Sequence, residues 1–268
     1  TAVGYQALYD STTGYNNTAV GTEALSNLTT GNNNNALGRN ALLTVTTGNY
    51  NVAVGSQALE LTTDGLGNVG VGHQALETNT TGDYNVAVGY QALESNTTAS
   101  NLTAVGYRAL LDNTTGTGNT ALGYSALQAN TTGTNNTAIG YQALSSQVAG
   151  GLNNTAVGTN AGLSNTTGDQ QVFVGRGSGE NTTTGGSNVF LGYIAGQANT
   201  TGNSNVVIGS SAMDVSTVSD RNIAIGTGTL GAQAHTTNED TYNTGVGYNA
   251  LNDLTTGLRN VAIGGLSL

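Results

Sequence analysis

Tyrosine side chains recur at one place in a repeated sequence unit, directly after a glycine. Seven tyrosines share this place: Tyr5, Tyr90, Tyr107, Tyr124, Tyr141, Tyr193 and Tyr248. Four of them, Tyr90, Tyr107, Tyr124 and Tyr141, come from consecutive units. Stacked, exposed rings could bind a sugar or a protein, because each ring offers apolar area together with a polar hydroxyl. The alternative, which we favour, is a structural ladder of rings beside a turn.

Residues that could catalyse a reaction or bind a metal are few and scattered. His235, Glu239 and Asp240 lie together in one irregular stretch, but a zinc site needs at least three ligands, and we expect a solvated loop there. The chain has no cysteine and only two histidines. It shows no nucleophile elbow, no phosphate-binding loop followed by lysine and no paired carboxylates. We therefore predict a non-enzymatic protein without cofactor or metal.

The elements that carry these residues are short units that recur, with a period of 17, along the whole chain of 268 residues. The glycine that closes the motif Ala-Val-Gly is taken as position 0 of each unit. Sixteen glycines occupy it: Gly4, Gly21, Gly38, Gly55, Gly72, Gly89, Gly106, Gly123, Gly140, Gly158, Gly175, Gly192, Gly209, Gly226, Gly247 and Gly264. Thirteen of the fifteen spacings are 17, one is 18 and one is 21. Such repetition indicates stacked units, and we predict a single array over residues 1–268 with irregular coils at 141–158 and 227–247.

Each unit carries the signal of a short strand at positions −3 to −1. Aliphatic or β-branched residues usually occupy −3 and −1, as in Val86 and Val88, and a small residue, usually alanine, occupies −2. Alternation puts −3 and −1 on one face and −2 on the other. We expect a second short strand at +3 and +4, where Ala92 and Leu93 give one apolar plug per unit. Glycines at 0 and +10 mark two corners, because glycine accepts positive φ.

The pattern predicts an all-β fold, a parallel β-solenoid or β-roll of about sixteen coils. Two helices cannot form from so short a unit, which holds two glycines, asparagine clusters and β-branched runs. We expect the small residue at −2 to face outward and pack against another chain, so we predict a parallel homotrimer. Phe173 and Phe190 replace it in adjacent coils and Val207 follows in the next. We interpret these three as interface residues, with a local adhesive patch as the alternative.

Asn-Thr-Thr recurs near the second corner of the unit. Its amides and hydroxyls are expected to form ladders, each bonded to its copy in the next coil. The same asparagines lie in Asn-x-Ser/Thr sequons, of which the chain has twelve. We place six at the outer corner as candidate N-glycosylation sites: Asn79, Asn96, Asn113, Asn130, Asn165 and Asn199. In a producer that does not glycosylate asparagine they would be incidental.

Charge is scarce, which excludes several classes of partner. Only 7% of the residues are charged, with five arginines, no lysine and a net charge of −10. Nucleic-acid binding needs clustered positive charge, so we exclude it. No stretch approaches the roughly 20 apolar residues of a membrane helix, so we expect no membrane insertion in this segment. The regular apolar pattern and the absence of proline favour an ordered chain over a disordered one.

The repeat resembles the Asn-Ser-Val-Ala-Ile-Gly repeat of trimeric autotransporter adhesin heads, the YadA-like heads. The matching stretches are 85–89 (Asn-Val-Ala-Val-Gly), 222–226 (Asn-Ile-Ala-Ile-Gly) and 260–264 (Asn-Val-Ala-Ile-Gly). Those heads are left-handed parallel β-rolls that trimerise side by side on bacterial surfaces and bind matrix or cells. Similar arrays occur in bacteriophage tail fibres. The family's usual repeat is a few residues shorter, so the second corner should be larger here.

The resemblance implies an extracellular structural or adhesive fibre on a cell or virion surface. Its partners would be copies of itself and a host-cell, matrix or glycan receptor. One alternative is a self-assembling extracellular filament, N-glycosylated if its producer modifies asparagine. A second is an ice-binding solenoid, in which rows of threonine match a crystal surface. Against the second, the threonines come as adjacent pairs, which in a strand would face opposite sides.

Overall fold

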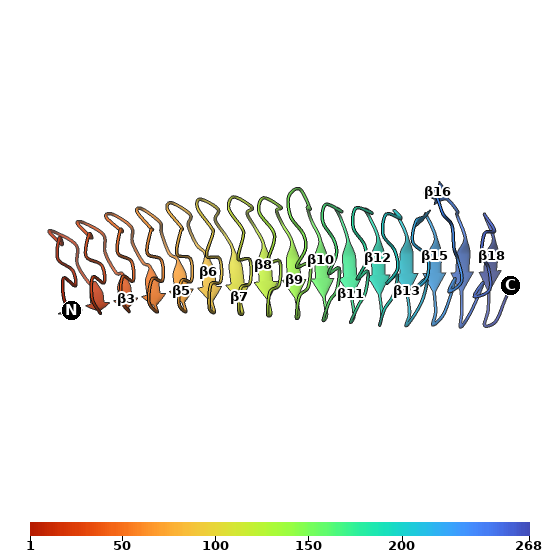
Figure 1. Cartoon of the computed structure of the whole chain (residues 1–268), viewed down its shortest axis with the longest axis horizontal. Helices are drawn as coiled ribbons and strands as arrows, with labels where there is room; N and C mark the ends of the chain where they lie inside the picture. Colours follow the sequence, from red (N-terminus) through yellow and green to blue (C-terminus); the bar gives the residue numbers. More distant parts are fainter. The chain divides into compact units, whose positions relative to one another are not determined.

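A computed structural model describes all 268 residues of the chain. The chain is all-β and forms a parallel β-solenoid, in which each coil contributes one strand, usually of three residues, to a parallel sheet. It comprises two compact units, residues 1–132 and 133–268. Within each unit, Figure 1 shows the strand arrows of successive coils side by side, connected by the remainder of each coil. The predicted fold class is confirmed.

The first unit holds eight parallel strands that pair in chain order. They are β1 (Ala2–Val3), β2 (Thr18–Val20), β3 (Asn35–Leu37), β4 (Val52–Val54), β5 (Val69–Val71), β6 (Val86–Val88), β7 (Thr103–Val105) and β8 (Thr120–Leu122). The register advances by one repeat per strand, so that Val52 lies beside Val69 and Val69 beside Val86. Equivalent positions of successive coils therefore form columns along the unit.

The second unit repeats this arrangement and adds one small sheet. Its main strands are β9 (Thr137–Ile139), β10 (Thr155–Val157), β11 (Val172–Val174), β12 (Val189–Leu191), β13 (Val206–Ile208), β15 (Ile223–Ile225), β17 (Thr244–Val246) and β18 (Val261–Ile263). The other two strands, β14 (Ser219–Asp220) and β16 (Glu239–Asp240), pair with each other. The long coil predicted at 227–247 supplies β16, and the main sheet continues past it without a change of register.

Position −2 faces the interior, which corrects the expectation of an outward alanine. Ala87 is fully buried, whereas Val86 and Val88 on either side of it are partly exposed. The interior of a coil is narrow, and Ala87 shares it with Ala92 and Leu93, which are both fully buried. Three such side chains per coil fill the space, so the larger residues at −3 and −1 lie outside.

The segment at +3 and +4 is a tight turn and not a strand, although its role as an apolar plug is confirmed. Gln91 at +2 and Leu93 at +4 both have a φ of 54°. This left-handed conformation costs about 1–2 kcal/mol for a residue other than glycine. The burial of Leu93 offsets that cost, because fully burying a leucine side chain contributes about 1.5–3 kcal/mol.

The two corner glycines serve different purposes. Gly55 at position 0 has a φ of 136°, and a Cβ there would collide with the carbonyl of Gly72 in the next coil. Gly31 at +10 is not in the left-handed region, but a Cβ on it would overlap Leu28 and the carbonyl of Gly48. At Gly31 the second corner therefore needs glycine for close approach and not for its backbone angles.

Phe173, Phe190 and Val207 are fully buried in the core, so the prediction that they lie at an interface is wrong. The coils that carry phenylalanine at −2 have Gly179 and Gly196 at +4, where most coils have leucine. A Cβ on Gly179 would overlap the Phe173 ring, and one on Gly196 would overlap the Phe190 ring. Most coils therefore fill their interior with leucine at +4, whereas these two coils fill it with phenylalanine at −2 on the opposite wall.

Buried asparagines recur at −4 in most coils and at +7 in six of them, and they join the walls of the coils that carry them. Asn68 Nδ2 donates to the carbonyl oxygen of Gly82 at 2.8 Å, and Asn79 Nδ2 donates to the same oxygen at 3.1 Å. Between coils, the backbone N–H of Asn85 donates to Asn68 Oδ1 at 2.9 Å, and Asn96 Nδ2 donates to Asn79 Oδ1 at 2.8 Å. The predicted amide ladder is confirmed, but it lies inside the solenoid.

Candidate functional site

The side chains at −3 and −1 form an apolar surface on the outer side of each unit's main sheet, called here the outer face. Position −1 is valine, leucine or isoleucine in every coil. Position −3 is valine or isoleucine in eight coils, threonine in seven and asparagine in one. No charged residue occupies either column. Association with another apolar surface is the chemistry that such a face supports.

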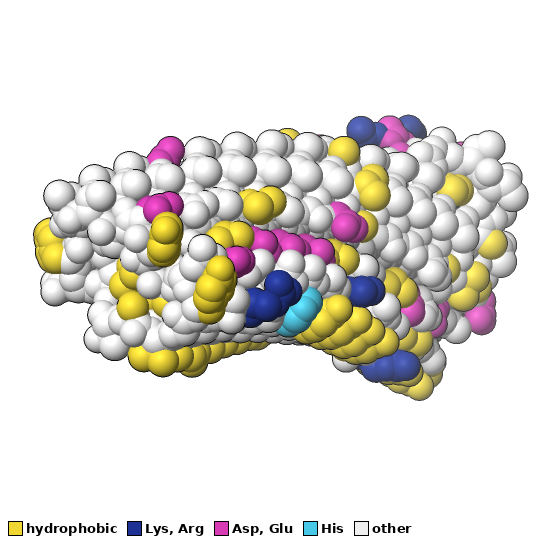
Figure 2. All heavy atoms as spheres, turned by 60° about the vertical axis from the view of Figure 1, so that its left-hand side comes forward, with side chains coloured by type: hydrophobic (Ala, Val, Ile, Leu, Met, Phe, Trp, Pro, Cys, Tyr) yellow, Lys and Arg dark blue, Asp and Glu magenta, His cyan; other side chains and the backbone are white.

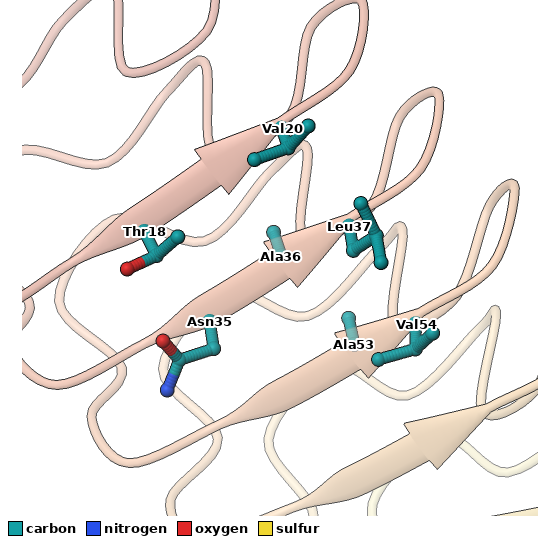
Figure 3. A pocket seen from close by; sticks show the side chains of 7 residues that line it. All are labelled: Thr18, Val20, Asn35, Ala36, Leu37, Ala53 and Val54. Atoms are coloured by element: carbon teal, nitrogen blue, oxygen red, sulfur yellow. The ribbon is translucent and has the colours of Figure 1, made fainter. Parts of the chain in front are cut away.

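The leucines of the outer face protrude further into solvent than a valine in the same column. In the first unit Leu37 is 51% exposed and Leu122 is 46% exposed, against 36% for Val54. A hollow of about 160 Å³ lies next to Leu37 (Figure 3). Its lining consists of Thr18, Val20, Asn35, Ala36, Leu37, Ala53 and Val54. The face is therefore ridged, with protruding side chains beside an open depression.

The predicted structural ladder of aromatic rings is confirmed in the first unit. The ring of His73 stacks on Tyr90, Tyr90 on Tyr107 and Tyr107 on Tyr124, with centroids 5.5, 5.4 and 4.9 Å apart. These four residues are called the tyrosine ladder. Its rings cover each other's faces, so mainly edges and hydroxyl groups meet solvent. Tyr141 holds the same position in the second unit and is 49% exposed.

Carboxylates occupy position +5 in three consecutive coils of the first unit, at Glu60, Glu77 and Glu94. Figure 2 shows a row of acidic side chains next to a histidine and a run of hydrophobic side chains. Burial raises the pKa of Glu77, and the carboxylates of Glu94 and Glu60 raise it further. Burial also raises the pKa of Glu94, against a lowering by the Arg108 guanidinium. No three histidine, aspartate or glutamate side chains are placed to hold a metal ion.

The six candidate glycosylation sites are not at an outer corner. The asparagines concerned are all fully buried: Asn79, Asn96, Asn113, Asn130, Asn165 and Asn199. They form the column at +7, whose amides bond to the second corner and to one another, so a sugar could be attached only by opening the coil. Other sequons lie five residues before position 0, where Asn16, Asn101, Asn135 and Asn153 are exposed. Nothing in the sequence alone showed which sequons face inward.

The long coil holds the group of His235, Glu239 and Asp240, for which we expect a solvated loop. His235 is only 7% exposed, and its Nδ1 contacts the Glu239 carboxylate. Glu239 belongs to strand β16, and Asp240 of the same strand pairs with Arg221. The expectation of a solvated loop is therefore wrong for His235, whose ring packs inside the coil.

The outer face is the site that sequence reasoning placed wrongly. An outward −2 column implies that −3 and −1 face inward, and the only sign to the contrary in the sequence is the threonine and asparagine at −3. A scan against protein-family models found no match, and searches of curated proteins and of solved structures found none either. No helix of the chain could cross a membrane. Fold and surface together define a β-solenoid repeat protein.

Proposed function

We propose that this chain is a structural segment of an extracellular fibre, without enzymatic activity, that associates laterally with copies of itself through the outer face. The observation that carries the proposal is that face: it is aliphatic at −1 in every coil and free of charge. Monomeric soluble proteins rarely expose a contiguous apolar surface of this kind. The predicted parallel homotrimer is kept, but its contact moves from the alanine column to the −3 and −1 columns.

A second copy of the chain is the partner that fits this surface best. Neighbouring strands of a sheet lie about 4.8 Å apart, so two copies that run in the same direction match coil by coil. A partner with another periodicity loses the match after a few coils. Each coil adds only a small apolar contact, at about 25 cal/mol per Å², but the contacts add up along the array.

The resemblance of residues 85–89, 222–226 and 260–264 to adhesin heads supports a place on a cell or virion surface. In a trimer, the outer face is covered by the other copies, so a receptor would bind to side chains elsewhere on the surface. The tyrosine ladder is one such group, and its hydroxyl groups offer donors and acceptors to a glycan or protein receptor.

The native mass of the intact chain tests the proposal. Light scattering coupled to size exclusion should give about three times the chain mass of 26.8 kDa. Replacing Val71 and Val88 with glutamate places two charges on the outer face, and we expect a folded monomer from this variant. Thr81→Glu, at an exposed corner, is the matched control and should leave the mass unchanged. A wild-type chain that stays monomeric at all concentrations would overturn the proposal.

Ice binding is a second candidate, and one observation favours it. Threonines at −3 line up on the outer face, where Thr103 lies beside Thr120 and Val105 beside Leu122. These threonines alternate with aliphatic residues on one sheet face, unlike the adjacent pairs at the corner. A regular array of hydroxyl and methyl groups suits a crystal surface. A monomeric chain that produces thermal hysteresis would support this candidate, and a trimer without hysteresis would exclude it.

A further inference from the structure

The coil that contains β3 departs from the outer-face pattern at both outward positions. Asn35 is the one amide in the −3 column, and Leu37 at −1 is larger than the valines of the two adjacent coils. Figure 3 shows Val20, Leu37 and Val54 in one row and Thr18 and Asn35 in the other. Leu37 protrudes from its row, with 51% of its surface exposed.

The hollow of about 160 Å³ lies over β2, β3 and β4, centred on the same coil. Asn35 and Leu37 both line it. Valine and threonine branch at Cβ and carry two γ atoms there, whereas asparagine branches only at Cγ. Space is left open next to the Asn35 Cβ. A knob, Leu37, and an adjacent hollow therefore lie at one level of the solenoid.

The amide of Asn35 has no partner within the chain. The residue is exposed and its side chain makes no hydrogen bond. Burying an unpaired amide against aliphatic side chains is unfavourable. An amide carries both donors and acceptors, so a contact that buries it against other copies is favourable only at a level that leaves it a polar partner or solvent.

Rotational symmetry relates these features when several copies associate. An axis parallel to the stack of coils places each coil level with its own counterpart. Strand direction runs the same way around the axis, so the −1 side of one copy meets the −3 side of the next. Leu37 of one copy then faces the hollow beside Asn35 of its neighbour, and the Asn35 amides of all copies lie at one level.

We propose that Asn35 and Leu37 are a register key, which fixes the alignment of copies of this chain along the outer face. The inference rests on the proposed function, because it concerns the same contact. A slip of one coil, about 4.8 Å, moves Leu37 away from the centre of the hollow and sets the Asn35 amide at the level of valine or threonine. A single buried asparagine fixes the register of coiled coils in the same way, at some cost in stability.

The remainder of the −3 column supports the same alignment. In the first unit it reads Thr1, Thr18, Asn35, then Val52, Val69, Val86, then Thr103 and Thr120. Copies in register keep the polar side chains of the −3 column at common levels around the axis. A slip of three coils sets the first polar block level with the valine block, where polar side chains are buried among aliphatic ones.

Distances between copies test the register directly. The chain has no cysteine, so Thr98→Cys at an exposed corner gives one spin label per chain in the full-length protein. Pulsed electron paramagnetic resonance should show one narrow distance in this background. Adding Asn35→Val should keep the oligomer mass but broaden the distribution toward longer distances. Thr120→Val, which also replaces a polar residue at −3, should leave the distribution narrow.

The knob is tested by truncation. Leu37→Ala should lower the association constant by about tenfold or more, because it removes three carbon atoms that pack into the hollow of the neighbouring copy. Leu122→Ala removes the same atoms from a similarly exposed residue whose coil carries threonine and not asparagine at −3, and its effect should be clearly smaller. Circular dichroism of each variant checks that the coils are intact.

Two outcomes would overturn the register key. One is a distribution as narrow in Asn35→Val as in the parent, and the other is an equal loss of association in Leu37→Ala and Leu122→Ala. Either result would leave a trimer without this key. A parent chain that is monomeric and shows no distance between labels would instead refute the proposed function on which the key rests.

Discussion

In the coil of Phe173 the large side chain lies at −2 and glycine lies at +4. This explanation of how the coil is filled can be tested by moving the large side chain back to +4. Phe173 is fully buried, and its ring occupies the space that a side chain on Gly179 would need. Phe173→Ala leaves that space empty. Removing a buried phenylalanine costs about 3–5 kcal/mol, and we expect a loss in this range from the free energy of unfolding.

Adding Gly179→Leu to this variant recreates the common pairing of alanine at −2 with leucine at +4. The backbone already suits it, since Gly179 has a φ of 59° and Leu93 at the same position has 54°. Leucine costs about 1–2 kcal/mol in this conformation, and the Phe173 ring also covers Gly162 in the preceding coil. We therefore expect partial rescue, about 1–3 kcal/mol. Gly179→Leu alone should destabilise the chain, because its Cβ overlaps the ring.

Urea unfolding of the full-length chain, followed by circular dichroism at one fixed protein concentration, measures all four members of this cycle. Close residues with a shared space show coupling in such a cycle. Thr184→Ala, at an exposed corner, is the control and should change stability by no more than about 0.5 kcal/mol. If the double variant is no more stable than Phe173→Ala, then phenylalanine at −2 does not replace leucine at +4 as the side chain that fills the coil, and our explanation is refuted.

Three further predictions concern the amide column, the carboxylate row and the sequons. Asn68→Ala leaves the buried N–H of Asn85 unpaired and should lower the free energy of unfolding in urea by about 2–4 kcal/mol. A loss no larger than that of the surface change Thr81→Ala would contradict the role of Asn68 in joining the walls of its coil. The raised pKa of Glu77 means that its ionised form disfavours the folded state, so stability should fall as pH rises from its ordinary value of 4.5 through the raised value. Glu77→Gln should raise the melting temperature at pH 7 and not below about pH 4, and an equal gain at both pH values would count against it. In a host that glycosylates asparagine, peptide mapping should find sugar at exposed sequons such as Asn16, and sugar on Asn79 in folded protein would contradict its burial.

The sequence does not show which residues of a coil face inward, and this is where sequence reasoning fails most clearly. Alternation at −3, −2 and −1 separates two faces, but it does not say which one is inside. Valine is more often buried than exposed, and that preference led to the wrong answer here. The choice depends on the width of the coil, which follows from Ala92 and Leu93 on the opposite wall.

The positions of Phe173, Phe190 and the buried sequons follow from the same cause. A phenylalanine at −2 looks like a surface anomaly when −2 is assigned to the outside, and becomes a core residue once −2 points inward. Its partner glycine at +4 was visible in the sequence, but only the folded coil brings the two positions together. Asn79 likewise reads as an exposed corner residue until the turn directs its amide inside.

The sequence by itself determined the architecture. Its strict period, the glycine at position 0, the short strand before it and the recurring amides predict a parallel solenoid with ladders, because a strict repeat must place equivalent residues in equivalent environments. Only the tertiary structure decided which columns face inward, which amides are buried and where the outer face is hollow. Those outcomes depend on distances across a coil between residues that the sequence separates, because the residue at −2 shares the space inside the coil with the residues on the opposite wall.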